Sequence, residues 1–256
     1  MSAHASARPP VSVVIAARDA ARHIGDCIAS VVDWAGEVIV VENDSTDDTV
    51  ERARAAGAAV FSNPFHTIGA QRNAAIVRAT QPWILVVDAD ERCTPELAAE
   101  IPRVLASPDR EAYRIRRRNF FLRREIAHGG WDRDRPVRLF RSTLRYDEQK
   151  VHEHVVTGAP PGELGAPLLH YPYDSLDEYF EKFERYSRWW AEQSWARGRR
   201  ASALAVFVKP PTRFLSMYLL RGGFLDGAAG LVLAVLAAMS VAAKYARLWA
   251  LGRRRG

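Results

Sequence analysis

The 256-residue sequence has only two cysteines, Cys27 and Cys93, which is too few for a disulfide framework. A reducing, cytoplasmic setting is therefore expected. The first ten residues, MSAHASARPP, lack the apolar run of a signal peptide, so none is predicted. No G-x-G-x-x-G follows the first predicted strand, which argues against a dinucleotide-dependent oxidoreductase. Internal repeats and low-complexity segments are also missing.

Charge of one sign is only slightly in excess, with 36 Lys and Arg against 30 Asp and Glu and a formal net charge of +6. Much of the excess lies late in the chain, where basic residues alternate with apolar ones. This pattern favours an anionic membrane surface as a partner, and nucleic acid is not expected.

The late apolar run from Gly227 to Ala243 contains 17 uncharged residues. As a helix it would be about 25 Å long, short of a hydrocarbon core of about 30 Å. We therefore expect a helix that lies on or dips into the cytoplasmic leaflet of a membrane. A buried helix or a dimer contact is the alternative.

Strand and helix signals alternate through the first hundred residues. Apolar, β-branched runs at 11–17, 37–41, 58–61 and 83–87 predict strands, and segments 24–31, 44–57 and 70–79 predict helices. Such alternation is typical of an α/β fold with a parallel sheet covered by helices. These sheets bind ligands beyond the carboxyl ends of their strands, which is where Arg18, Glu42 and Asp88 fall.

The segment ILVVDADE, residues 84–91, places three carboxylates at the tip of a buried strand. Their repulsion and desolvation cost stability, so a cation is expected beside them. Asp88 and Asp90 suit a hard divalent ion that could bridge to a diphosphate. The alternative is a solvated turn before a helix that begins near Pro95, with Thr94 as its N-cap.

The segment VENDSTDDT, residues 41–49, also has two interpretations. Ser45, Thr46 and Asp47 are ordinary helix-capping residues. Capping does not explain Glu42, whose carboxylate at a strand tip could accept hydrogen bonds from a base or a ribose.

Several segments together resemble a family 2 glycosyltransferase with the GT-A (Rossmann-like) nucleotide-sugar fold. They are VSVVIAARDAARHIGDCIASV, VIVVENDSTDDT, GAQRNAAIVRA and WILVVDADE, in the expected order. The later HGGWDRDRPVRLFR, KVHEHV and RFLSMYLLRGGFLDGAAGL resemble the lipopolysaccharide-core β-1,4-glucosyltransferases. The resemblance spans about residues 10–248. It departs from the family at Glu42, where Asp is more usual, and at Asn43-Asp44, which replaces an Asp-Gly or Ser-Gly pair.

The resemblance implies an inverting transfer of a hexose, glucose from UDP-glucose above all, to a lipid-linked saccharide such as the lipopolysaccharide core. It implies a nucleotide-sugar-binding half over 1–108, an acceptor-binding and catalytic half over 109–175, and membrane-associating helices over 176–256. The nucleotide-sugar contacts would come from Ala16, Ala17, Arg18, Glu42, Arg72, Asn73 and Asp88. For Arg72 the alternative is a surface helix start. Asp88, Asp90 (the DXD motif) and His170 would hold Mg²⁺ or Mn²⁺.

Inverting transfer also needs a general base to take the proton of the acceptor hydroxyl. In VHEHV, strand alternation places Glu153 on an apolar face, and it is the first candidate; an ion pair with an arginine is its alternative. Asp134, in GGWDRD, is the second candidate. Trp131 could stack on an acceptor sugar or close a core, and Arg138 is a further acceptor-binding candidate.

Three other functions stay open. A polyprenyl-phosphate glycosyltransferase would differ in its acceptor. A nucleotidyltransferase shares the sheet and the metal chemistry, but the loop AARDAARH lacks the glycine-rich, Lys/Arg-bearing character of that class. A non-catalytic membrane adaptor is disfavoured by the intact Asp88 and Asp90.

Overall fold

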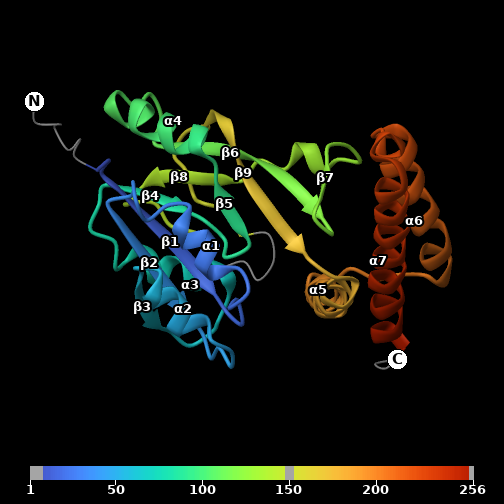
Figure 1. The fold of residues 1–256 in the computed structure, drawn as a ribbon. Coiled ribbons are helices and arrows are strands. Elements are labelled where there is room, and N and C mark those ends of the chain that lie inside the picture. Colours follow the sequence, from blue (N-terminus) through green and yellow to red (C-terminus); the bar gives the residue numbers. More distant parts are fainter. Residues whose placement is uncertain (1–7, 148–152, 254–256) are drawn as a thin grey trace, which may run out of the picture. The chain divides into compact units, whose positions relative to one another are not determined.

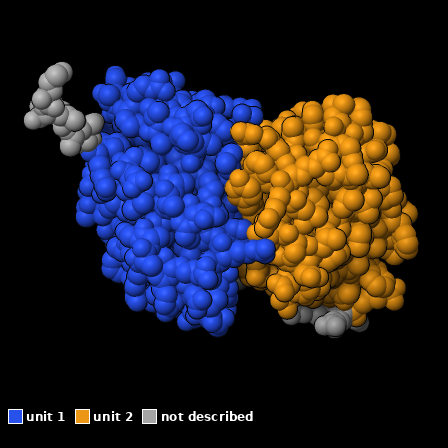
Figure 2. Space-filling model, viewed as in Figure 1, with its two compact units in different colours: residues 1–117, 135–170 blue, residues 118–134, 171–256 orange. Residues whose placement is uncertain are grey.

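The computed structural model describes residues 8–147 and 153–253 (Figure 1). The chain forms two compact units, residues 1–117 with 135–170 and residues 118–134 with 171–256 (Figure 2). Strands β6 (Ala112–Phe121) and β9 (Gly162–Tyr173) each begin in the first unit and end in the second. The segment 109–175, expected as one part, is therefore shared between the units.

Parallel strands form the first half of the sheet. β1 (Val11–Ala17) pairs in parallel with β2 (Glu37–Glu42) and with β4 (Trp83–Val86), and β3 (Ala59–Ser62) extends the sheet beyond β2. The predicted alternation of strands and helices is thus confirmed.

Antiparallel strands continue the same sheet. β8 (Val137–Arg141) pairs with β4, and β5 (Glu91–Cys93) pairs with β9. The full order is β3-β2-β1-β4-β8-β6-β9-β5, and β7 (Arg124–Ile126) pairs with β6.

Helices cover both faces of the parallel strands, because both faces are apolar. On one face lie α1 (Ile24–Ala29), α2 (Thr49–Ala55) and α4 (Pro95–Ala106), whose Ile28, Ala53 and Leu97 join one buried cluster with Val13 and Ile15. On the other face, α3 (Ile68–Ile76) contributes to a second cluster around Val14 and Ile84. Packing on both faces of the parallel strands fixes the positions of the strand ends, where the candidate site lies.

The second unit is mostly helical. It contains α5 (Leu176–Ala196), α6 (Ala203–Leu215) and α7 (Gly227–Arg253), with a π-helical turn at Ser216–Leu220 and a 3₁₀ turn at Gly223–Asp226. Its core includes Phe121, Ile126, Tyr179, Met217 and Leu233. α5 begins at Leu176, where the segment expected to be helical begins. Its Leu176 and Phe180 are each 42% exposed.

α7 is longer than the sequence predicted. It has 27 residues because the helix continues through Lys244 to Arg253, and at 1.5 Å per residue it measures about 40 Å. Helix Gly223–Arg253 is the single candidate membrane span in the described residues, with a mean hydropathy of 2.0 and 28% of its apolar window buried inside the protein. Length alone therefore no longer separates a span from an interfacial helix.

Candidate active site

The carboxyl ends of β1 and β2 lie side by side at one edge of the sheet. Ala17 is paired with Glu42, and the Asn43 N–H donates to the Ala17 carbonyl at 3.3 Å. Ala16 and Ala17, both expected in the nucleoside pocket, are therefore adjacent to Glu42. Arg18 extends beyond this edge, with 56% of its side chain exposed.

Glu42 is 8% exposed and accepts a hydrogen bond from the Ser45 N–H at 3.1 Å. Burial would raise the pKa of Glu42, but hydrogen bonds from Ser45 and Ser62 outweigh it and lower the pKa. Beside it, the Nδ2 atom of Asn43 is buried without a partner among the described residues. The tip of β2 thus presents an ionised acceptor and an unpaired amide donor.

The loops after β1 and β2 are tied together by the acidic side chains of VENDSTDDT and its neighbours. The Ala21 N–H donates to Asp47 at 3.0 Å, and the Thr46 N–H donates to Asp19 at 2.8 Å. Bridging between the loops thus accounts for these residues. The capping interpretation is not observed, because the N-cap of α2, Asp48, makes no side-chain cap hydrogen bond.

The turn after β4 closes on itself through Asp88 and Glu91. The Asp88 N–H donates to the Glu91 carboxylate at 2.7 Å, and the Glu91 N–H donates to the Asp88 carbonyl at 2.8 Å. Glu91 is fully buried, with 0% exposure. Two carboxylates are therefore fixed within one turn at the end of a core strand.

Three arginines supply the positive charge that this turn requires. Arg72 from α3 lies 2.5 Å from Asp88 Oδ1, and Arg117 from β6 lies 2.8 Å from Asp88 Oδ2. Arg138 from β8 also binds Asp88 Oδ2 and lies 3.1 Å from Glu91, which Arg117 contacts at 2.5 Å. Both oxygens of Asp88 are thus engaged by guanidinium groups of the protein itself.

These ion pairs keep the carboxylates charged. Burial would raise the pKa of Asp88, but Arg138, Arg72 and Arg117 hold it well below its usual value. For Glu91, Arg117 and Arg138 likewise lower a pKa that burial would raise. The cation predicted beside DADE is therefore present as buried arginine.

Arg72 also binds Glu153, the first general-base candidate. The Arg72 side chain is 9% exposed and that of Glu153 is 11% exposed. The surface-helix alternative for Arg72 is thus wrong, and the ion-pair alternative for Glu153 is observed. Glu153 and His154 lie outside any strand, and residues 148–152, which include Val151, lie outside the described residues.

Asn73 holds the segment that leads to Glu153. Its amide donates to the Tyr146 carbonyl and accepts from the Tyr146 N–H, each at 2.9 Å. Gly69, one turn earlier on α3, allows this segment to approach: a Cβ there would lie 2.6 Å from the Asp147 carbonyl oxygen. Asn73, expected near the base or phosphates, therefore pairs with the backbone of the first unit.

Asp90 and His170 form a second pair beside the arginine cluster. Antiparallel pairing sets His170 opposite Glu91, and His170 Nε2 lies 3.7 Å from Asp90 Oδ1. Their side chains are 15% and 24% exposed. Burial lowers the pKa of His170, although Asp90 opposes the shift, so the neutral imidazole that a metal binds is favoured. Among the described residues, no group of three or more His, Cys, Asp or Glu could hold a metal.

The remaining predicted residues divide between the units. Arg138, expected at the acceptor, is 2% exposed and binds carboxylates instead. Trp131 begins a 3₁₀ turn (Trp131–Arg133) in the second unit and packs edge-on against Phe121, with ring centroids 6.4 Å apart. It therefore helps to close a core, as its alternative predicted. Asp134 follows that turn.

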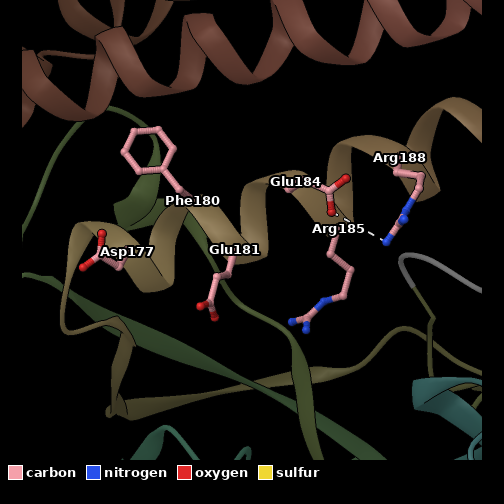
Figure 3. A pocket seen from close by; sticks show the side chains of 6 residues that line it. All are labelled: Asp177, Phe180, Glu181, Glu184, Arg185 and Arg188. Carbon is pink, nitrogen blue, oxygen red and sulfur yellow. Dashed lines mark ion pairs between the residues drawn. The ribbon is translucent and has the colours of Figure 1, made fainter.

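A hollow of about 740 Å³ runs along the second unit's α5 (Figure 3). Its lining is mostly charged, and Glu184 and Arg188, one turn apart on α5, form an ion pair at 3.6 Å. None of the predicted site residues lines it; the lining consists of Asp177, Phe180, Glu181, Glu184, Arg185 and Arg188.

Arg117 and Glu91 are the members of the cluster to which the sequence had assigned no role. Arg117 has the same strand parity as Tyr113 and Ile115, which are both buried. An arginine on a buried strand face requires an anionic partner. The shared parity of Arg117 with buried residues was therefore the sequence signal that could have predicted its buried ion pair.

The chain belongs to glycosyl transferase family 2, whose model matches residues 12–159. This membership and the observed α/β sheet agree with the expected GT-A fold. The chain is 30% identical to the lipopolysaccharide core biosynthesis glycosyltransferase LpsC of Rhizobium meliloti over 93% of each chain. It is 27% identical to an uncharacterized glycosyltransferase of Rickettsia typhi, over 93% of this chain and 86% of the other.

Among solved structures, glucosyl-3-phosphoglycerate synthase from Mycobacterium tuberculosis, in complex with Mg²⁺ and UDP, is 24% identical. The similarity is partial. It covers 44% of each chain, with a TM-score of 0.38.

Proposed function

We propose that this enzyme is an inverting, metal-dependent hexosyltransferase that moves glucose from UDP-glucose to a lipid-linked saccharide such as the lipopolysaccharide core. The observation that carries this proposal is the Asp90–His170 pair, at the carboxyl end of β4 and beside carboxylates that arginines already neutralise. The relative named as a lipopolysaccharide core glycosyltransferase supports the acceptor class.

The donor set fits a divalent ion that is shared with a substrate. Mg²⁺ is typically bound through one or two carboxylates together with substrate phosphates and water. Asp90 and His170 would be the direct protein ligands. Asp88, with both oxygens on arginines, would act through water or ribose or by fixing the turn. When bound, Mg²⁺ or Mn²⁺ would stabilise the negative charge of the departing diphosphate.

The nucleoside would lie over the tips of β1 and β2. Glu42 offers a carboxylate to donors on the base or ribose, and Asn43 offers a buried N–H group without a partner among the described residues. An unpaired buried donor costs about 1–3 kcal/mol, so a ligand oxygen that accepts from it would gain affinity.

Proton removal in this proposal belongs to Glu153. Its carboxylate would take the proton of the acceptor hydroxyl as that oxygen bonds to the anomeric carbon and the bond to the diphosphate breaks. Arg72 fixes the orientation of Glu153 and ties it to the turn of Asp88. Asp134 is the second candidate for this role.

The exposed apolar surface of the second unit supports a membrane-binding site. Large apolar side chains are exposed on its tail, among them Leu220 at 83%, Phe207 at 75% and Leu204 at 69%. An exposed apolar surface of this kind marks an interaction site, and the basic residues around it favour anionic lipid. The tail would thus hold the enzyme on the cytoplasmic face of the membrane, near a lipid-linked acceptor.

A screen of nucleotide sugars tests the donor. Purified enzyme should release UDP from UDP-glucose only with Mn²⁺ or Mg²⁺, even without an acceptor, and Asp33→Asn, at an exposed position in the first unit, should behave as wild type. Release of the nucleotide from a different nucleotide sugar would identify that compound as the donor. Release of UDP without a metal would refute the metal site. Transfer to lipopolysaccharide rather than to polyprenyl phosphate would decide the acceptor.

A further inference from the structure

A buried carboxylate from the tail holds the loop that bears the HGGW motif. Asp226, whose side chain is 6% exposed, closes the 3₁₀ turn before α7. Its Oδ1 accepts the Ala127 N–H at 3.2 Å, and its Oδ2 accepts the His128 N–H at 3.0 Å. Its Oδ1 also lies 2.9 Å from His128 Nδ1. One side chain, about a hundred residues away in sequence, therefore makes three contacts with two consecutive residues.

The backbone of the same tail segment reinforces this attachment. The Gly129 N–H donates to the Arg221 carbonyl at 2.9 Å. Gly130 has φ 94°, and a Cβ there would lie 2.6 Å from the Arg221 guanidinium. Asn119 fixes the far end of the loop by donating to the Trp131 carbonyl at 2.8 Å. The loop is thus held at both ends within the second unit.

These contacts fix the tautomer of His128. A carboxylate only accepts hydrogen bonds, so a close Nδ1 must carry a proton. In the neutral ring, Nε2 is then the acceptor. The His128 side chain is 39% exposed, and the structure shows no partner for Nε2 within residues 8–147 and 153–253. The ring therefore offers a lone pair to an outside donor.

We propose that His128 binds a hydroxyl group of the acceptor saccharide through Nε2, with Asp226 as its positioning residue. This inference rests on the proposed function, because it needs a saccharide acceptor. A sugar hydroxyl is the matching group, since it donates to a neutral nitrogen and carries no charge to balance. The tail, besides its membrane role, thereby becomes part of the acceptor site.

The positioning step is tested without any substrate. In alkaline buffer, where imidazoles are neutral, ¹⁵N NMR of the wild-type enzyme should show His128 with its proton on Nδ1. Asp226→Asn leaves one acceptor oxygen for these three contacts, and its NH₂ group must face one of them, so the share of the ring protonated on Nε2 should rise. A wild-type ring protonated on Nε2 would overturn the proposal, whether or not the Asp226→Asn enzyme folds.

The binding step is tested with His128→Asn, whose amide can keep the contact to Asp226 but has no atom at Nε2. The probe is lipopolysaccharide extracted from the host strain lacking this gene. We expect kcat/KM for that probe to fall about tenfold, the scale of one lost hydrogen bond, while Mn²⁺-dependent UDP-glucose hydrolysis stays unchanged. His66→Asn, at an exposed histidine in the first unit, is the matched control.

The outcomes separate the two proposals. Unchanged kcat/KM in His128→Asn overturns the acceptor contact and leaves the proposed function standing. Wild-type enzyme without hydrolysis or transfer refutes the proposed function, and the acceptor contact fails with it; the NMR result then shows only whether Asp226 sets the ring.

Discussion

Removal of Arg138 should destabilise the enzyme more than removal of any exposed arginine. Arg138 is 2% exposed, binds Asp88 and lies 3.1 Å from Glu91, which is itself fully buried. Loss of one partner from a buried ion pair costs about 3–5 kcal/mol, because the remaining charge stays desolvated. We therefore expect Arg138→Met to lower the free energy of unfolding by about 3–5 kcal/mol in urea titrations followed by circular dichroism.

Arg118→Met is the matched control. Arg118 pairs with Glu125 at the surface, with side chains 41% and 39% exposed, and such pairs contribute about 0–1 kcal/mol. The double variant Arg138→Met/Glu91→Gln should recover part of the loss, because it also removes one negative charge from the cluster, where Arg72 and Arg117 remain. A loss below about 1 kcal/mol for Arg138→Met would show that the cluster does not need its buried cation.

Three further predictions concern the base, acid stability and the membrane. Glu153→Gln should reduce turnover roughly 10²-fold with little change in UDP affinity. If Asp134→Asn is inactive and Glu153→Gln is active, Asp134 is the general base instead of Glu153. Asp88 and Glu91 have lowered pKa values, so the stability that they contribute is complete above about pH 4 and is lost as the pH falls through their folded pKa values. In urea titrations from pH 7 to 3, the difference in unfolding free energy between wild type and Arg138→Met should therefore narrow below pH 4. A constant difference would contradict this. In sedimentation with anionic liposomes, the double variant Phe207→Gln/Leu220→Gln should bind about tenfold more weakly than wild type. The control Val77→Gln, at a position 70% exposed in the first unit, should bind as wild type. Equal binding of wild type, double variant and control would exclude the tail surface as the membrane site.

The parallel half of the fold could be predicted from the sequence because its signals are local. β1 begins and ends where the apolar run predicted, and the other three predicted strands differ from the observed ones by one residue at one or both ends. α7 was underestimated because the prediction stopped at Lys244. A helix does not end at a charged residue whose long side chain can reach solvent.

Partners of charged residues could not be predicted, because they come from distant parts of the chain. The position of Asp88 at a buried strand end predicted a neighbouring cation, and its spacing from Asp90 favoured a metal. The contacts with Arg117 and Arg138 depend on how β6 and β8 pair, and no local pattern encodes that register. The contact between Asp226 and His128 could not be predicted for the same reason, because the two residues lie 98 positions apart in the sequence.

The donor site is most directly tested by calorimetric titration of UDP into wild-type enzyme and Asp90→Asn, each with and without Mn²⁺. Asp90 with His170 would hold the ion against the diphosphate, whereas Glu42 and Asn43 would contact the nucleoside without it. Wild-type enzyme should therefore bind UDP at least tenfold more tightly with Mn²⁺ than without it. Asp90→Asn should bind UDP equally weakly in both conditions. A Mn²⁺-dependent gain that survives in Asp90→Asn would contradict the metal assignment.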